Sequence, residues 1–160
     1  NFIEVYFSFG RKKRIVIVPE NDSETGREIS LTQNDVREFQ LVKSAIASGI
    51  FILMDSAGIQ AADMCEVVVA GAFGSFINVT SARSIGLLPF PDSTKVRQVG
   101  NAAGAGACLA VRDGTAYDEI RNLRKQITYI ELVNAPGFKK VFARAAYFGD
   151  KKSVKGESDD

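Results

Sequence analysis

Two glycine-containing turns are the features of this sequence best suited to chemistry, because they could bring backbone amides close to an anionic ligand. Gly71 and Gly74 follow the apolar residues 67–70 and lead into a predicted helix. Glycine has no side chain to block the backbone, and the free N–H groups at the start of a helix attract phosphate or ribose oxygens. The pattern therefore predicts a nucleotide site, although a tight strand-to-helix turn would use the same glycines.

A second glycine cluster follows the strand-like residues 96–99 and contains Gly100, Gly104 and Gly106. Asn101 stands at the start of the predicted helix, where its side chain would either accept a backbone hydrogen bond as the N-cap or face the nucleotide. Close packing of a helix rich in small residues explains Gly104 and Gly106 better than phosphate contact does. A dinucleotide site of the Gly-x-Gly type is disfavoured, because the acidic residue expected about 20 positions later is missing.

The residue types exclude several catalytic chemistries. The chain has no histidine, which rules out a histidine base, a Ser-His-Asp triad and histidine metal ligands. Cys65 and Cys108 lack Cys-x-x-Cys spacing and lie in apolar contexts, so we expect buried, inert thiols in a reducing compartment. Asp35, Glu38 and Lys43 lie near one another on the predicted long helix and could in principle bind Mg²⁺ or phosphate, but helix capping and charge pairing explain them more economically. The sequence therefore predicts no metal site and identifies no catalytic residue.

The elements that would position the glycine turns indicate an α/β fold. Residues 67–70 form an apolar run without polar alternation, which suits a strand buried on both faces of a parallel sheet. Thr32 and Asp35 have the spacing of a capping box and predict the start of a long helix that ends at Gly58. Apolar residues recur along this helix at steps of three and four, and we expect them to face the core: Phe39, Val42, Ile46, Gly49, Ile50, Leu53, Met54 and Ala57.

Further elements are predicted on both sides of this region. The basic run 11–14 lies between two strands of a hairpin within residues 1–18, and is either a solvated turn or a docking patch for an acidic partner. Pro89 stops a helical stretch that follows the first glycine turn and reaches about residue 87. The rest of the chain is expected to hold strands at 29–31, 95–99 and 127–132, helices at 101–112, 116–125 and 138–147, and a disordered polar tail at 151–160.

Length and composition place the chain among ordinary globular domains. Its 160 residues suffice for one core, and 46% apolar and 24% charged residues are typical of water-soluble proteins. A net charge of +1 gives no attraction to nucleic acid, and the apolar runs are shorter than the ~20 residues that a membrane-spanning helix needs. The start at Asn1 resembles neither a signal nor a transit peptide, and we expect the chain to be a piece of a longer protein.

Four motifs in fixed order carry a resemblance to a known family. They are Thr32-Gln33-Asn34-Asp35-Val36-Arg37-Glu38-Phe39-Gln40-Leu41-Val42-Lys43-Ser44-Ala45-Ile46, Ala70-Gly71-Ala72-Phe73-Gly74, Ile85-Gly86-Leu87-Leu88-Pro89 and Val99-Gly100-Asn101-Ala102-Ala103-Gly104-Ala105-Gly106-Ala107. Over residues 29–148 the chain resembles the carboxyl-terminal part of the reductive activators of corrinoid proteins. Those ATP-dependent proteins return an oxidised cobalt cofactor to its working state.

The resemblance implies an actin-like ATPase (ribonuclease H-like) half-domain, an α/β structure with a mixed sheet flanked by helices. Residues 1–150 would form it, with a strand-rich start at 1–31 and an α/β part at 32–150. In this superfamily two α/β halves enclose a nucleotide, and Gly71 and Gly74 would form the adenosine-contacting loop. Ala72, Phe73 and Ser75 would add backbone amides or an adenine-facing surface, unless Phe73 lies in the core; Asn101 and Gly104 complete the candidate set.

The implied function is an ATP-dependent reductive activation that returns cobalt(II) corrinoid proteins to cobalt(I). Electrons would come from an iron–sulfur cluster outside this chain, and the catalytic and Mg²⁺-binding residues would lie upstream, so the chain alone would be inactive. The implied partner is the corrinoid protein of a methyltransferase system in the cytoplasm of an anaerobe, and a homodimer is allowed. Two alternatives stay open: a small-molecule kinase of the same superfamily, and a non-catalytic nucleotide-sensing module that dimerises through its apolar faces.

Overall fold

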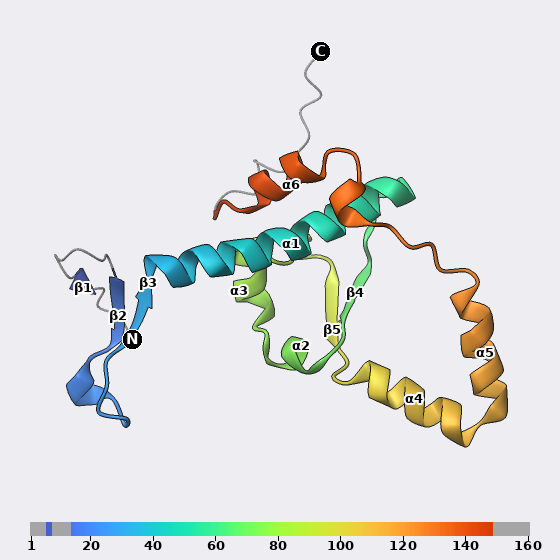
Figure 1. Cartoon of the computed structure of the whole chain (residues 1–160), viewed down its shortest axis with the longest axis horizontal. Helices are drawn as coiled ribbons and strands as arrows, with labels where there is room; N and C mark the ends of the chain where they lie inside the picture. Colours follow the sequence, from blue (N-terminus) through green and yellow to red (C-terminus); the bar gives the residue numbers. More distant parts are fainter. Residues whose placement is uncertain (1–5, 8–13, 149–160) are drawn as a thin grey trace, which may run out of the picture. The chain divides into compact units, whose positions relative to one another are not determined.

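The computed structural model describes residues 6–7 and 14–148, which fall into two compact units (Figure 1). The first unit comprises residues 1–43 and the second residues 44–160, so the boundary between them lies within the long helix α1 (Gln33–Ala57). The first unit contains an antiparallel sheet. The second contains a parallel strand pair and most of the helices, including both glycine turns.

The antiparallel sheet has the strand order β1 (Tyr6–Phe7), β2 (Arg14–Val18) and β3 (Ile29–Thr32). A 3-10 turn at Glu20–Asp22 lies in the connection between β2 and β3. The predicted hairpin and the short strand at 29–31 are confirmed, whereas residues 11–13 of the basic run lie outside the described residues.

The long helix α1 begins and ends as the sequence predicts. The amide of Thr32 donates to Asp35 Oδ2 at 2.8 Å, and the amide of Asp35 donates to Thr32 Oγ1 at 3.2 Å, which is a capping box. The carboxylate also accepts the Thr32 hydroxyl, and these hydrogen bonds lower the pKa of Asp35. At the other end, Gly58 adopts a φ of +67°, a left-handed conformation that glycine adopts without strain.

The prediction of which face of α1 is buried is largely wrong. Gly49 and Met54 are buried and Ile50 is half-buried, but Phe39, Ile46 and Ala57 are exposed, and Val42 and Leu53 are 51% and 53% exposed. The buried positions are mainly small or polar: Lys43, Ser44, Ala47, Ser48, Gly49, Ile52 and Met54. Small side chains let neighbouring segments approach closely, as at Gly49, where an added Cβ would lie 3.3 Å from Leu132 Cδ1. Both sets recur at helical spacing, so periodicity alone did not distinguish them.

Lys43 is buried, although a surface position was expected, and burial lowers the pKa of its ammonium group. α1 is long and apolar enough to cross a membrane. A helix in the core of a folded domain can have the same length and composition. About a third of the most apolar 18-residue stretch of α1 is buried inside the protein.

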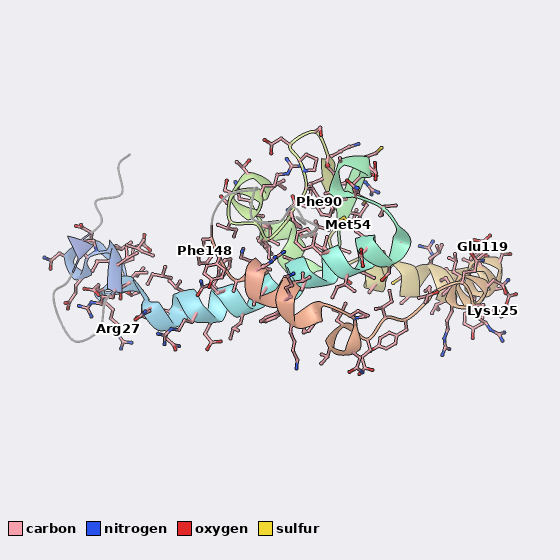
Figure 2. The ribbon with its side chains drawn as sticks, turned by 90° about the horizontal axis from the view of Figure 1, so that it is seen from above. Arg27, Met54, Phe90, Glu119, Lys125 and Phe148 are labelled. Atoms are coloured by element: carbon pink, nitrogen blue, oxygen red, sulfur yellow. The ribbon has the colours of Figure 1, made fainter. Side chains whose placement is uncertain are left out.

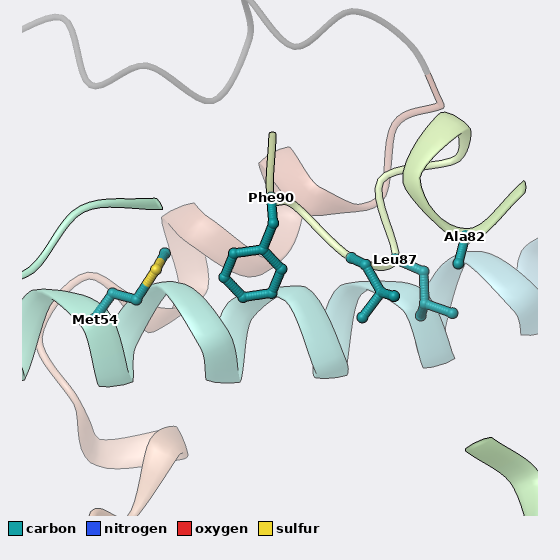
Figure 3. Close-up of a cluster of buried hydrophobic side chains, with 5 residues drawn as sticks. Met54, Ala82, Leu87 and Phe90 are labelled. Atoms are coloured by element: carbon teal, nitrogen blue, oxygen red, sulfur yellow. The ribbon is translucent and has the colours of Figure 1, made fainter. Parts of the chain in front are cut away.

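The core of the second unit is a cluster of five buried apolar side chains (Figure 3). Met54 comes from α1, Ala82 from α3 (Val79–Ser84), and Leu87, Leu88 and Phe90 from the loop that follows α3. Gly86 in that loop has a φ of +76°, as expected for a glycine that ends a helix before Pro89. The first glycine turn is followed by two short helices rather than one helical stretch, because Asn78 starts α3 by accepting the Ser81 amide at 2.9 Å.

The strands β4 (Glu66–Val69) and β5 (Lys95–Gln98) pair in parallel, with Glu66 opposite Lys95 and Val69 opposite Gln98. A 3-10 turn at Ala61–Asp63 precedes β4. The expectation that this strand is buried on both faces is wrong, since Val68 is 48% exposed while Val67 and Val69 are half-buried. Within the described residues, side chains cover only one face of the pair.

Three helices complete the second unit. α4 (Ala102–Arg112) and α5 (Gly114–Arg124) meet at Asp113, whose Oδ1 accepts the amides of Thr115 and Ala116 and so starts α5. The two helices contact each other, and Figure 2 shows the side chains of α5, including Glu119, projecting outward. α6 (Phe138–Ala145) confirms the closing helix.

The strand predicted at 127–132 is wrong. Ile127 and Tyr129 are largely exposed, and a 3-10 turn at Leu132–Asn134 follows them. Alternating apolar residues satisfy the side-chain pattern of a strand, but a strand also needs a backbone partner, and no described segment supplies one here.

Candidate functional site

The two glycine turns lie at the same edge of the parallel strand pair. Because β4 and β5 run in the same direction, their carboxyl ends coincide, and the amide of Val99 donates to the carbonyl oxygen of Val69 at 3.0 Å. Just beyond this pair, the amide of Gly71 donates to the carbonyl oxygen of Gly100. Ligands of open α/β sheets bind outside the carboxyl ends of the strands, so this edge is the candidate site.

The turns have the backbone conformations that favour glycine. Gly71 has a φ of +99° and Gly100 a φ of +60°. A Cβ added at Gly71 would meet nothing within 4 Å, so the space beside this turn is open. At Gly100 an added Cβ would lie 3.7 Å from Ser75 Oγ, which places Ser75 beside the second turn.

Gly74 has a different role, because it lies buried within α2 (Ala72–Phe76). An added Cβ would come within 2.5 Å of Val69 Cγ1, so only glycine lets α2 pack this closely on β4. The side-chain amide of Gln98 donates to the carbonyl oxygen of Gly74 and, at 2.9 Å, to that of Ile77. Gln98 was not among the predicted site residues, although its place at the end of a strand, just before the second glycine turn, was a signal for it.

The structural role of Asn101 is confirmed. Its Oδ1 accepts the Gly104 amide at 2.9 Å, and this caps α4. A Cβ added at Gly104 would lie 2.5 Å from Asn101 Nδ2, so the glycine makes room for the capping side chain. The expectation of close helix packing is wrong for Gly106, where an added Cβ would meet no described atom within 4 Å.

Most predicted site residues thus lie at the carboxyl ends of β4 and β5, because the backbones of the two turns are hydrogen-bonded to each other there. Ala72 and Ser75 are exposed in α2, and Phe73 lies in the first turn of the same helix. The amides of Ala72, Phe73 and Ala103 are in first helical turns, where no acceptor exists four residues earlier in the helix. Amides that lack a partner within their helix can donate to ribose and phosphate oxygens, and the space beside Gly71 is open.

Glu66 and Lys95 begin the two parallel strands, at the end opposite the glycine turns. Glu66, the first residue of β4, accepts a hydrogen bond from Arg97 Nε at 3.0 Å and lies 3.8 Å from Lys95 Nζ. The Arg97 hydrogen bond is the main reason that the pKa of Glu66 is lowered. Cys65 and Cys108 are exposed, so the prediction of buried thiols is wrong: Cys65 precedes β4, and Cys108 lies on the solvent-facing side of α4. Among residues 14–148 no cluster of carboxylates and thiols could hold a metal ion.

Comparison with known proteins decides the family. The profile described as "C-terminal domain of RACo the ASKHA domain" matches residues 4–157, nearly the whole chain. The chain belongs to this family. The resemblance to corrinoid reductive activators and the actin-like ATPase fold are thereby confirmed for this RACo C-terminal domain, and domains of the ASKHA type bind nucleotides.

Two curated proteins are similar to this chain. The corrinoid activation enzyme RamQ of Eubacterium limosum is 39% identical over 138 residues, which are 86% of this chain and 23% of RamQ. The [Co(II) methylated amine-specific corrinoid protein] reductase of Methanosarcina barkeri is 29% identical over 110 residues, 69% of this chain and 20% of that protein.

A solved structure is also similar to the RACo C-terminal domain. The reductive activator for corrinoid, iron-sulfur protein matches with a TM-score of 0.77 and 28% identity, covering 89% of this chain and 23% of that one. The chain therefore spans less than a quarter of the length of the relatives that it matches.

Proposed function

We propose that this chain is the C-terminal nucleotide-binding part of an ATP-dependent reductive activator, which returns cobalt(II) corrinoid proteins to cobalt(I). The observation that carries the proposal is the pair of glycine turns joined by the Gly71–Gly100 hydrogen bond, at the strand edge of a RACo C-terminal ASKHA domain. The names of RamQ, a corrinoid activation enzyme, and of the methylated-amine-specific corrinoid protein reductase support the same proposal.

The proposed nucleotide is ATP, bound together with Mg²⁺. Gly71, Ala72, Phe73, Gly74 and Ser75 form the adenosine-facing turn, with Asn101 and Gly104 at the second turn. The first-turn amides of α2 and α4 donate to ribose or phosphate oxygens, and the open space beside Gly71 admits the ligand. Residues that hold Mg²⁺ and catalyse hydrolysis belong to the part of the polypeptide outside this chain.

The nucleotide acts by shifting a conformational equilibrium. ATP favours the arrangement of the full protein that binds it more tightly, and it can shift the equilibrium only by that difference in affinity. The shift makes possible an uphill transfer of one electron, which reduces cobalt(II) to cobalt(I). An iron–sulfur cluster outside this chain supplies the electron.

The proposed partner is the corrinoid protein of a methyltransferase system, in the cytoplasm of an anaerobe. The choice of a corrinoid protein follows the names of the relatives, which are much longer than this chain.

The deciding experiment uses the full-length gene product, a cobalt(II) corrinoid protein and a low-potential reductant. The visible spectrum reports cobalt(I) with and without ATP. ATP-dependent appearance of cobalt(I) is the expected result. ATP hydrolysis without any cobalt(I), in the presence of a partner shown to accept electrons chemically, would overturn the proposal.

A further inference from the structure

We propose that Gln98 is the positioning residue that holds α2 and the first glycine turn in the geometry that binds nucleotide. The inference rests on the nucleotide function proposed above and names a residue that the glycine motifs do not contain. Gln98 ends β5, yet its side-chain amide donates to two carbonyl oxygens of the segment that follows β4, those of Gly74 and Ile77. A single side chain thus connects β5 to α2.

The connection matters because α2 is too short to be stable without contacts to other elements. It comprises 5 residues, Ala72–Phe76, and an isolated helix of this length is unstable in water. The last carbonyl groups of any helix lack donors within the helix. Gln98 supplies two donors from outside, and so closes the carboxyl end of α2.

The contacts around α2 show how its position reaches the ligand edge. Gly74 packs against Val69 of β4 without room for a Cβ, and Gly71 is hydrogen-bonded to Gly100. Gln98 acts on the same helix from its other end. The amides of Ala72 and Phe73, which have no acceptor within α2, lie between these fixed points, so their direction depends on the position of α2. Loss of the Gln98 bonds therefore weakens nucleotide binding without removing any group that touches the ligand.

The test compares variants of the full-length gene product. Gln98→Glu keeps the shape of the side chain but replaces the donor group with a carboxylate that repels both carbonyl oxygens; Gln98→Met removes the bonds without adding charge. Arg97→Gln is the matched control, because Arg97 lies on the same strand and its hydrogen bond goes to Glu66 instead. Hydrogen exchange of a peptide covering residues 70–78 is measured without nucleotide, and the Kd for ATP by titration calorimetry.

Both Gln98 variants are expected to exchange faster over residues 70–78 and to bind ATP about tenfold more weakly, as the loss of one or two hydrogen bonds implies. Arg97→Gln should change neither quantity. For Gln98→Glu, the affinity relative to the parent protein should recover as the pH falls from 8 toward 5, because the protonated carboxyl regains a donor. A residue that only stabilised the fold would show no such pH-dependent recovery in Kd.

Three other outcomes would each contradict a different part of the proposal. Unchanged exchange in both Gln98 variants would show that Gln98 does not hold α2. Faster exchange with an unchanged Kd would show that the position of α2 does not matter for ATP, which overturns the inference while leaving the proposed function intact. Absence of ATP binding by the parent protein would overturn the proposed function and this inference together.

Discussion

The amide of Gly71 donates to the carbonyl oxygen of Gly100, and this bond decides which groups of the first turn are left for a ligand. Gly71 itself has no free amide, so its contribution is conformational: it bends the chain with a φ of +99° and leaves the space beside it open. The amides that follow it, at the start of α2, are the donors available to a nucleotide.

Replacing Gly71 by alanine tests this conformational role. An alanine side chain has room, but its backbone strongly disfavours this φ, so the turn should be destabilised by about 1–3 kcal/mol. We expect a weaker affinity for ATP, measured by titration of the full-length protein. Gly106→Ala is the control, since an added Cβ meets nothing within 4 Å and alanine favours a helix; it should leave the Kd unchanged. Equal Kd values for both variants would contradict the role of Gly71.

Gly74→Ala tests the packing of α2 on β4. The new Cβ would overlap Val69 Cγ1, and overpacking of this kind lowers stability by about 1–3 kcal/mol. The double variant with Val69→Ala removes the overlapping methyl groups and should recover part of the lost stability and of the ATP affinity. Thermal unfolding and ATP titration of both single variants and the double variant give the coupling between the sites. Purely additive effects would show that the contact does not limit the position of α2.

Asn101 can be tested for a second role beyond capping. Asn101→Ala should lower stability by about 1 kcal/mol through loss of the cap of α4. Asn101→Asp keeps a capping oxygen but adds a negative charge, so it should unfold at nearly the parent temperature. If Asn101 faces the phosphates, the aspartate variant will bind ATP more weakly than the parent. An unchanged Kd would leave Asn101 as a helix cap alone.

The capping box of α1 predicts that the stability of the folded protein depends on pH. Hydrogen bonds from Thr32 lower the pKa of Asp35 in the folded protein, so the carboxylate adds stability above its unfolded pKa of about 4. That contribution is lost as the pH falls through the lower, folded pKa. Asp35→Asn should therefore lower the unfolding temperature more at pH 7 than near pH 3. Glu38→Gln, an exposed change on the same helix, is the control. The same temperature difference for Asp35→Asn at both pH values would contradict the prediction.

Local signals in the sequence predict most elements of the fold correctly. Thr32 with Asp35, Gly58, and Gly86 before Pro89 each determine the conformation of their own few residues, so no distant contact is needed to interpret them. The prediction of a strand at 127–132 is wrong because a strand needs a pairing partner, which the local sequence cannot reveal. The prediction of the buried face of α1 is largely wrong because Ser44 and Ser48 are buried by what packs against them, whereas Val42 and Leu53 of the apolar stripe are exposed.

The site is predicted in part for the same reason. Glycines at the ends of two strands indicate backbone turns that a ligand can approach, and the parallel pairing brings them together. The position of Gln98 just before the second glycine turn is a signal for a site residue, but its two acceptors belong to a different strand–helix unit, so its contacts could not be predicted from spacing. The exposure of Cys65 and Cys108 depends on which faces are covered, and composition does not contain that information.

The parallel pair of β4 and β5 also affects how the protein can be handled. Within the described residues each strand has one neighbour, so both outer backbone edges are open, beside the uncharged segment Val67-Val68-Val69. An open edge with high β-propensity can accept a strand from another copy and seed aggregates. We therefore expect the isolated 160-residue chain to lose solubility as its concentration rises. A lysine introduced at the exposed position 68 should act as a gatekeeper against this self-association.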